Sequence, residues 1–221
     1  MEPTLPRGDV RAFYDRFGAK QDAQRFYEDA ALGDLSAHAA FESAESVYEF
    51  GCGTGRIAAE LLGYRLPQRA TYTGVDISTT MLALARGRIA PFGARAAVRQ
   101  IDGSDPFAIC PAGVDRILCT YVLDLLPEEE IASFIANAAL HLNHGGKLAV
   151  VSLTFGNTLF SRTVSAGWRA LFRIAPSVVG GCRPLRLQRF LAEWRIEHQA
   201  VISSWGIASE VIVASPAAAA R

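Results

Sequence analysis

Short apolar segments alternate with longer segments of helical periodicity from residue 46 to residue 153. The apolar segments have the length of strands and lie at 46–50, 71–76, 96–101, 114–122 and 147–153. The helical patterns lie between them, at 55–63, 78–89 and 127–142. The apolar segments lack the clean alternation of polar and apolar residues that marks a half-exposed strand, which is typical of strands buried on both faces. The sequence therefore predicts an α/β fold in which helices cover both faces of a largely parallel sheet.

The segments on either side of this alternation predict helices and a hairpin. Residues 10–31 contain aromatic side chains set among charges, which is typical of one or two amphipathic helices, here broken near Gly18. A shorter helix is expected at 35–41, and residues 155–192 are expected to form helix and loop. The segment 194–214 predicts two strands joined by a tight turn, and such a hairpin places the last strand antiparallel.

Positive and negative side chains balance, because Lys plus Arg and Asp plus Glu both number 22. A neutral chain has no overall field that would draw it to nucleic acid or to a membrane, so we expect no nucleic-acid partner. The charge is unevenly placed, however, since no Asp or Glu lies between Glu130 and Glu193. That span is locally basic and contains Arg162, Arg169, Arg173, Arg183, Arg186 and Arg189.

The four cysteines form no CxxC pair and no spacing with histidine that would hold a metal. We expect buried or half-buried thiols in a reducing compartment, and no metal site. The first ten residues have no apolar core of a secretion signal, and no segment reaches the roughly 18–20 apolar residues that span a bilayer. We therefore expect a cytoplasmic protein without a transmembrane segment, as a monomer or a homodimer.

The stretch VYEFGCGTGR, residues 47–56, places three glycines directly after the first predicted strand. Gly51, Gly53 and Gly55 let the backbone turn tightly and let a ligand approach without contacting a Cβ atom. In open α/β sheets, cofactors bind beyond the carboxyl ends of the strands, where such a turn lies. The dinucleotide fingerprint requires glycine at the position of Arg56, and no Gly-Lys-Ser/Thr of a phosphate-binding loop follows. The turn therefore predicts a cofactor pocket of another kind.

Two carboxylates flank this turn and narrow the choice of cofactor. Glu49, near the end of the first strand, suits an ammonium group better than a pyrophosphate. Asp76 ends the second predicted strand, 21 residues after Gly55, where a carboxylate can accept hydrogen bonds from both hydroxyls of a ribose. Together these residues predict a site for an adenosine that carries an amino-acid tail. The cofactor with that structure is S-adenosylmethionine.

Five sequence blocks in order resemble the class I S-adenosylmethionine-dependent methyltransferases. The blocks are VYEFGCGTGR, TGVDIS, IDGSDPF, VDRILCTYVLDLLP and GGKLAVVSL, and they cover residues 47–153. The likeness is greatest to the small-molecule branch that includes the ubiquinone and menaquinone biosynthesis C-methyltransferases. It implies a Rossmann-like sheet of seven strands, mostly parallel with an antiparallel last strand. The sequence NHGG at 143–146 departs from the more usual Lys-Pro-Gly-Gly, which affects a turn.

The resemblance implies roles at the methionine and ribose end of the cofactor. Glu49 would lie near the methionine ammonium, and Asp76 would bind the ribose hydroxyls. The three glycines Gly51, Gly53 and Gly55 would line the methionine and the ribose.

Further roles concern the adenine and the cap. Ile77 would pack on the adenine, and Asp102, beside Gly103, would receive its amino group. The alternative for Asp102 is that it only initiates a turn before Pro106. The backbone around Thr120 and Tyr121 would face the methionine amine. An N-terminal helix carrying Tyr14 would cap the cofactor.

One structural domain with four parts is expected. The parts are an N-terminal helical cap at 1–45, a cofactor-binding α/β core at 46–154, a helical substrate lid at 155–192 and a terminal β-hairpin at 193–215. The acceptor would bind between the cap and the segment 155–189. The aromatic residues there favour an apolar or aromatic acceptor, and they are Phe13, Phe17, Phe155, Trp168 and Phe172.

Methyl transfer from a sulfonium is an in-line displacement in which the cofactor carries its own leaving group. Positioning therefore supplies much of the rate, and a base is needed only if the nucleophile must lose a proton. The candidates for catalytic groups are Tyr14, Tyr121 and Asp124. The alternative for Asp124 is an ordinary acid near a helix start, and that for Tyr14 is a core residue. His38 and His198 show no partner in the sequence, and we expect neither to be catalytic.

Arginines and apolar residues separate on the helix expected after residue 155. Arg162, Arg169 and Arg173 fall on one face, while another is lined by Val164, Trp168, Leu171 and Ala175. Two functions fit this pattern: a lid that faces an anionic or lipidic substrate, or a weak contact with a membrane surface through the basic segment 162–189. The alternative is a solvated helix whose apolar side covers the sheet.

The function favoured by the sequence is methyl transfer from S-adenosylmethionine to a small, apolar or aromatic acceptor. One alternative is a tRNA or protein methyltransferase. The sequence TYVLDL argues against it, because amino-group nucleic-acid methylases have at this place a sequence that resembles Asn/Asp-Pro-Pro-Tyr. Another is a non-catalytic cofactor-binding protein on the same fold, because transfer by positioning requires no unique side chain. A NAD-dependent oxidoreductase is disfavoured by Arg56.

Overall fold

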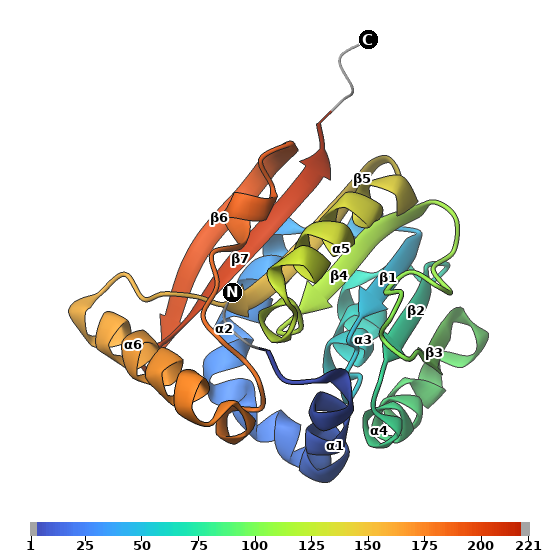
Figure 1. Ribbon diagram of the computed structural model, residues 1–221. Coiled ribbons are helices and arrows are strands. Elements are labelled where there is room, and N and C mark those ends of the chain that lie inside the picture. The colour runs from blue at the N-terminus through green and yellow to red at the C-terminus, as the bar shows by residue number, and fades with distance from the viewer. Residues whose placement is uncertain (1–3, 218–221) are drawn as a thin grey trace.

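The computed structural model describes residues 4–217, and residues 1–3 and 218–221 lie outside this range. Within it, seven strands form one sheet in the order β3-β2-β1-β4-β5-β7-β6 (Figure 1). The strands are β1 (Ser46–Phe50), β2 (Thr71–Asp76), β3 (Ala96–Gln100), β4 (Val114–Thr120), β5 (Leu142–Leu153), β6 (Trp194–Ser204) and β7 (Ile207–Pro216). Strands β1 to β5 are mutually parallel, and β7 is antiparallel to both of its neighbours. The predicted sheet, with its antiparallel last strand, is confirmed.

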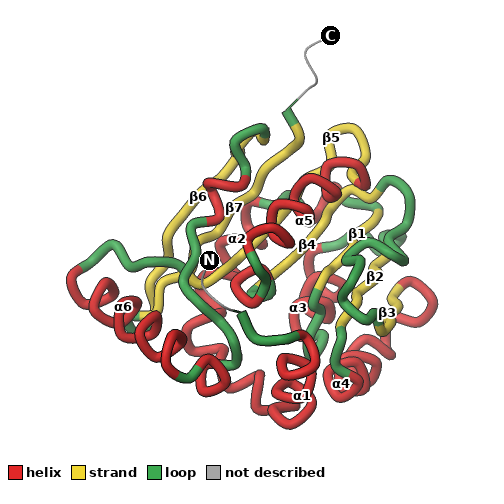
Figure 2. The backbone as a smooth tube through the Cα atoms, in the orientation of Figure 1, coloured by secondary structure: helices red, strands yellow, loops and turns green. Residues whose placement is uncertain are grey.

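Helices lie on both sides of this sheet (Figure 2). They are α1 (Arg7–Phe17), α2 (Arg25–His38), α3 (Arg56–Glu60), α4 (Thr79–Ile89), α5 (Glu128–His141) and α6 (Leu159–Ile174). One buried core joins α2, α3 and α4 to one face of the sheet, and a second core joins α5 to the other face. A 3-10 segment at Gly18–Gln24 separates α1 from α2, at the break predicted near Gly18.

Strand β1 shows why the central strands lack a clean alternation of polar and apolar residues. Successive side chains of a strand point to opposite faces of the sheet. Tyr48 and Phe50 join the core beneath α5, whereas Val47 joins the core beneath α2, α3 and α4. Because both faces are covered, no position along the strand is left for a solvated polar residue.

Two predicted boundaries were wrong. The expected helix at 35–41 is the end of α2, which runs to His38, followed by a 3-10 turn at Phe41–Ser43. Strand β5 begins at Leu142 rather than at 147, because Leu142 pairs with Val114 ahead of a register shift. A Cβ atom on Gly146 would lie 2.9 Å from the Asn143 carbonyl oxygen, so this close approach depends on glycine.

The strand order places the functional site. From β1 the chain continues to β2 and β3 on one side, and it then crosses to β4 on the other side of β1. A crevice forms beyond the carboxyl ends of parallel strands where the order reverses in this way, and ligands bind there in open α/β sheets. The glycine turn after β1 lies at this point.

Candidate cofactor site

The turn after β1 has left-handed backbone conformations at alternate residues. Gly51, Gly53 and Gly55 have φ angles of 78°, 51° and 73°, which residues with a Cβ atom rarely adopt. A Cβ atom on Gly51 would overlap the Val122 side chain, and one on Gly55 would lie 2.9 Å from the Cα atom of Ala85. A Cβ atom on Gly53 would meet nothing within 4 Å. Packing therefore requires two of the glycines, and the third leaves its side of the turn open.

Asp76, the last residue of β2, is hydrogen-bonded directly to this turn. Its carboxylate accepts hydrogen bonds from the Gly53 amide at 2.9 Å and from the Ser78 amide at 2.8 Å. Burial raises the pKa of the Asp76 carboxyl group, and these two hydrogen bonds oppose the increase. A carboxylate offers about four lone-pair positions, so each oxygen retains room to accept from a ligand hydroxyl.

Glu49 on β1 is buried beneath the turn and accepts a hydrogen bond from the Tyr72 hydroxyl. Burial raises the pKa of Glu49 to about 8, the Tyr72 hydrogen bond lowers it, and the charge of Asp76 adds to the increase. At neutral pH the Glu49 carboxyl group is therefore largely protonated. A positive charge placed beside it would favour its ionised form.

A cavity of about 530 Å³ lies beside the turn, within the size range of small-molecule sites. It brings together eight of the predicted site residues: Tyr14, Glu49, Gly51, Asp76, Ile77, Gly103, Thr120 and Tyr121. Another part of its wall is apolar and is formed by Leu5, Val10, Leu125, Leu126 and Pro127. The cavity thus offers acids and backbone groups in one part and apolar side chains in another.

The segment 155–192 contributes less to this cavity than expected. Among residues 4–217, the side chains that line the cavity come from positions 4–130. The segment approaches through Cys182, whose Sγ atom lies 3.7 Å from the Tyr14 hydroxyl. The N-terminal helices, rather than the later insertion, form the outer wall of the cavity.

Two predicted acids lie away from the cavity, as do Gly53 and Gly55 inside the turn. Asp102 is exposed, and its Oδ1 atom accepts from the Ser104 amide at 2.8 Å and from the Ser104 hydroxyl at 2.6 Å. These bonds hold the pKa of Asp102 below its usual range. Asp102 thus forms, through Oδ1, the turn that was predicted as its alternative role.

Asp124 is fully buried in the short turn Leu123–Leu125. Its Oδ2 atom accepts from the Leu153 amide at 3.3 Å, whereas its Oδ1 atom has no hydrogen-bond partner within residues 4–217. Burial raises the pKa of Asp124 to about 7. The group is therefore divided between its charged and neutral forms near neutral pH.

Tyr121 follows β4 with a left-handed backbone, at a φ angle of 55°. Such a conformation costs about 1–3 kcal/mol in a residue with a side chain, and it is concentrated at functional sites. The Tyr121 amide donates to the Val151 carbonyl at 2.8 Å, and the hydroxyl lies 2.9 Å from the Ser209 Oγ atom on β7. These bonds hold the residue where the end of β4 borders the cavity.

Residues 47–146 match the family model of a methyltransferase domain. The match begins in β1 and includes the glycine turn, Asp76 and β4, which together border the cavity. This stretch has the sequence of a methyltransferase domain. The resemblance found in the sequence is thereby confirmed, and S-adenosylmethionine is the cofactor of this class.

Two curated relatives share part of the methyltransferase domain. An uncharacterized methyltransferase from Bacillus cytotoxicus is 31% identical over 147 residues, which are 66% of this chain and 63% of that protein. A carboxy-S-adenosyl-L-methionine synthase from Chromohalobacter salexigens is 31% identical over 105 residues, which are 47% of this chain and 38% of that protein. The chain spans less than two thirds of the length of either relative.

Solved methyltransferases share the fold at low sequence identity. Magnesium protoporphyrin IX methyltransferase from Synechocystis, with bound S-adenosylhomocysteine, has a TM-score of 0.60 at 20% identity, covering 94% of this chain and 85% of that one. An O-methyltransferase from neocarzinostatin biosynthesis, in complex with S-adenosylhomocysteine and 1,4-dihydroxy-2-naphthoic acid, has a TM-score of 0.63 at 18% identity. This likeness covers 87% of this chain and 55% of that one. Both likenesses concern the fold.

Ion pairs connect the methyltransferase domain to the N-terminal helices. The sequence pattern did not reveal these ion pairs. Arg56, at the third fingerprint position, bonds to Glu28 on α2 at 2.9 Å. Arg88 on α4 bonds to Asp22 at 2.7 Å, and the Thr54 hydroxyl donates to the same Asp22 side chain at 2.8 Å. Side chains of the turn and its neighbours thus hold the segment 18–38 at the cavity.

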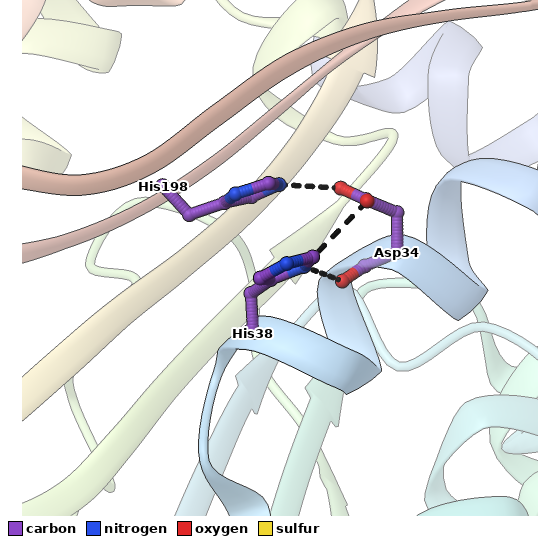
Figure 3. A group of neighbouring side chains, drawn as sticks. All are labelled: Asp34, His38 and His198. Atoms are coloured by element: carbon purple, nitrogen blue, oxygen red, sulfur yellow. Dashed lines mark hydrogen bonds and ion pairs between the residues drawn. The ribbon is translucent and has the colours of Figure 1, made fainter.

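A second group of polar side chains lies between α2 and β6 (Figure 3). His198 Nε2 is 2.6 Å from Asp34 Oδ2, and His38 Nδ1 is 2.8 Å from the Asp34 main-chain oxygen. The two imidazole rings are stacked, with centroids 3.6 Å apart and planes at 4°. A metal ion lies in the plane of each imidazole that binds it, so both rings would have to turn before they could share one ion. We interpret the group as a hydrogen-bonded link between α2 and β6.

Proposed function

We propose that this protein binds S-adenosylmethionine beside the glycine turn and transfers its methyl group to a small, apolar or aromatic acceptor. One observation carries the proposal: the turn, Asp76 and Glu49 all border the same cavity. Two carboxyl groups suit ribose hydroxyls and an ammonium group. A pyrophosphate carries no hydrogen-bond donor for either carboxyl group, and its charge would disfavour their ionised forms.

Each part of the cofactor has a place in this proposal. The methionine portion lies beside the turn that Gly53 and Gly55 shape, next to Gly51, with its ammonium near Glu49 and near the backbone of Thr120 and Tyr121. Asp76 binds the ribose hydroxyls through the lone pairs that its amide partners leave unused.

The adenine lies against Ile77 and Gly103. A Cβ atom on Gly103 would lie 3.2 Å from the Ile77 side chain, so these two residues form one narrow wall of the cavity. Asp102 binds Ser104 through Oδ1 and would receive the adenine amino group through Oδ2.

Bound S-adenosylmethionine supplies a methyl carbon that its sulfonium already activates, so the chain has mainly to position the acceptor and exclude water. Burial raises the pKa of both Tyr14 and Tyr121. Their hydroxyls therefore stay protonated at neutral pH and serve as hydrogen-bond donors rather than as bases. An acceptor that must lose a proton needs a carboxylate, and Glu28 lines the cavity with a pKa that burial raises to about 7. Burial also raises the pKa of Asp124 to about 7, but Asp124 does not line the cavity.

The identity of the acceptor can be tested without a guess at its structure. We would incubate the protein with extract of its source cells and S-adenosylmethionine that carries a deuterated methyl group. Mass spectrometry is expected to find a small apolar metabolite whose mass is shifted by the transferred group. Label found only in the tRNA or protein fraction would contradict a small-molecule acceptor. The Asp76→Ala variant serves as the matched control.

Cofactor binding is expected to release a proton from Glu49. The positive amino group of S-adenosylhomocysteine lowers the pKa of Glu49 from about 8, so binding tightens as the pH rises toward 8 and levels off above it. Calorimetric titrations at neutral pH, in two buffers of different ionisation enthalpy, measure the proton released. Glu49→Gln should abolish this release and flatten the pH dependence. Undiminished release in that variant would remove Glu49 from the role.

A further inference from the structure

Helix α6 exposes large apolar side chains on the side that faces away from the protein. Leu159 and Ile174, at its two ends, are 86% and 83% exposed. Toward the protein, α6 buries Ser161, Ser165 and Phe172 and half-buries Val164 and Trp168. A helix that only covers a sheet keeps its apolar residues on that inward side. Packing against the protein therefore does not account for the large apolar residues on the outer side of α6.

The exposed apolar residues form one surface, which we call the apolar face. Leu159, Ala166, Ala170 and Ile174 follow one another at intervals of four and seven residues, so they share one side of the helix. The turn between β6 and β7 adds Trp205, because a Cβ atom on the adjoining Gly206 would lie 2.6 Å from the Phe160 ring. The large members of the apolar face are Leu159, Phe160, Leu171, Ile174 and Trp205.

Positive charge borders this face along one edge. Arg162, Arg169 and Arg173 are spaced by seven and four residues and lie between the apolar face and the buried side of α6. Arg162 and Arg173 are exposed. The sequence contains no Asp or Glu between Glu130 and Glu193, so the helix itself brings no negative charge to the surface.

We infer that the apolar face of α6 rests in the surface of a bilayer that contains anionic lipid. An exposed apolar side bordered by arginines is typical of helices that lie in the membrane interface, where apolar side chains enter the acyl boundary and arginines meet the headgroups. The helix lies at the outer edge of the molecule, beside the β6–β7 hairpin (Figure 1). Within residues 4–217 no helix has the length and apolar character needed to cross a membrane, so the contact is with the surface. The inference rests on α6 and does not depend on the proposed activity.

Flotation with lipid vesicles tests this inference. The protein is expected to float with vesicles of phosphatidylcholine and phosphatidylglycerol, and to float less when salt is added. The double variant Leu159→Ser and Ile174→Ser should bind these vesicles at least about tenfold more weakly, because two large apolar side chains no longer leave water. Arg162→Gln should weaken binding about fivefold, and only where phosphatidylglycerol is present. Leu140→Ser is the matched control, since Leu140 is 80% exposed but lies on α5.

The alternative outcomes are distinct. Failure to float with vesicles that contain phosphatidylglycerol overturns the inference, as does an equal loss in the Leu140→Ser control. If sedimentation velocity shows self-association that the double variant abolishes, the apolar face belongs to an interface with a second copy of this chain. The double variant is expected to fold and to bind S-adenosylhomocysteine normally, because both residues are exposed and neither borders the cavity. A failure of cofactor binding in the unaltered protein would therefore count against the proposed function alone.

Discussion

Replacing Asp76 with alanine is expected to weaken the binding of S-adenosylhomocysteine by about 1.5–3 kcal/mol, a loss of roughly 10- to 150-fold in affinity. The reason is geometric, because the Asp76 carboxylate lies at the end of β2 and borders the cavity beside the glycine turn. The substitution also removes the acceptor for the Gly53 amide at 2.9 Å, which loosens the turn. Isothermal titration calorimetry measures the change directly.

Two further variants separate ligand binding from support of the turn. Asp76→Asn retains one carbonyl acceptor and should lose less affinity than the alanine variant. Asp105→Ala removes another carboxylate that accepts a backbone amide, from Phe107 at 2.8 Å, but it does not border the cavity and should leave affinity unchanged. Unaltered affinity in Asp76→Ala would exclude Asp76 from the cofactor site.

Gly55→Ala is expected to lower the free energy of unfolding by about 2–4 kcal/mol. Two effects combine at this residue. Its φ angle of 73° is unfavourable for alanine, and the added Cβ atom would lie 2.9 Å from the Cα atom of Ala85 in α4. Because that neighbour is backbone, it cannot rotate away. Urea denaturation followed by circular dichroism measures the loss.

Gly87→Ala is the matched control for this substitution. Gly87 lies within α4, on the helix that Gly55 contacts, and a Cβ atom there would meet nothing within 4 Å. Alanine is the better helix former, so this variant should raise the free energy of unfolding by about 0.5–1 kcal/mol. Equal stability of the Gly55→Ala and Gly87→Ala variants would show that the turn is not constrained as described.

The central part of the fold could be predicted because its signals are local. Strands β4 and β5 contain continuous apolar runs, and the left-handed positions of the turn require glycine at spacings that are visible in the sequence. The alignment of Asp76 with that turn follows from the parallel pairing of β1 with β2, which such patterns also predict.

Other features could not be predicted because they depend on contacts between distant residues. The pairing of Arg56 with Glu28 joins positions 28 apart, and no local pattern signals it. The link from His198 to Asp34 joins positions 164 apart. Periodicity showed which residues of α6 share a side, but not which side the rest of the chain would cover. The buried position of Asp124 depends in the same way on β5, whose Leu153 amide donates a hydrogen bond to it.

A crystal structure of the protein with S-adenosylhomocysteine tests the central claim most directly. We predict density for the ligand in the cavity beside the glycine turn, with both ribose hydroxyls within hydrogen-bond distance of Asp76 and the amino group beside Glu49. A cavity without ligand under saturating conditions, or a ligand bound elsewhere on the chain, would contradict it.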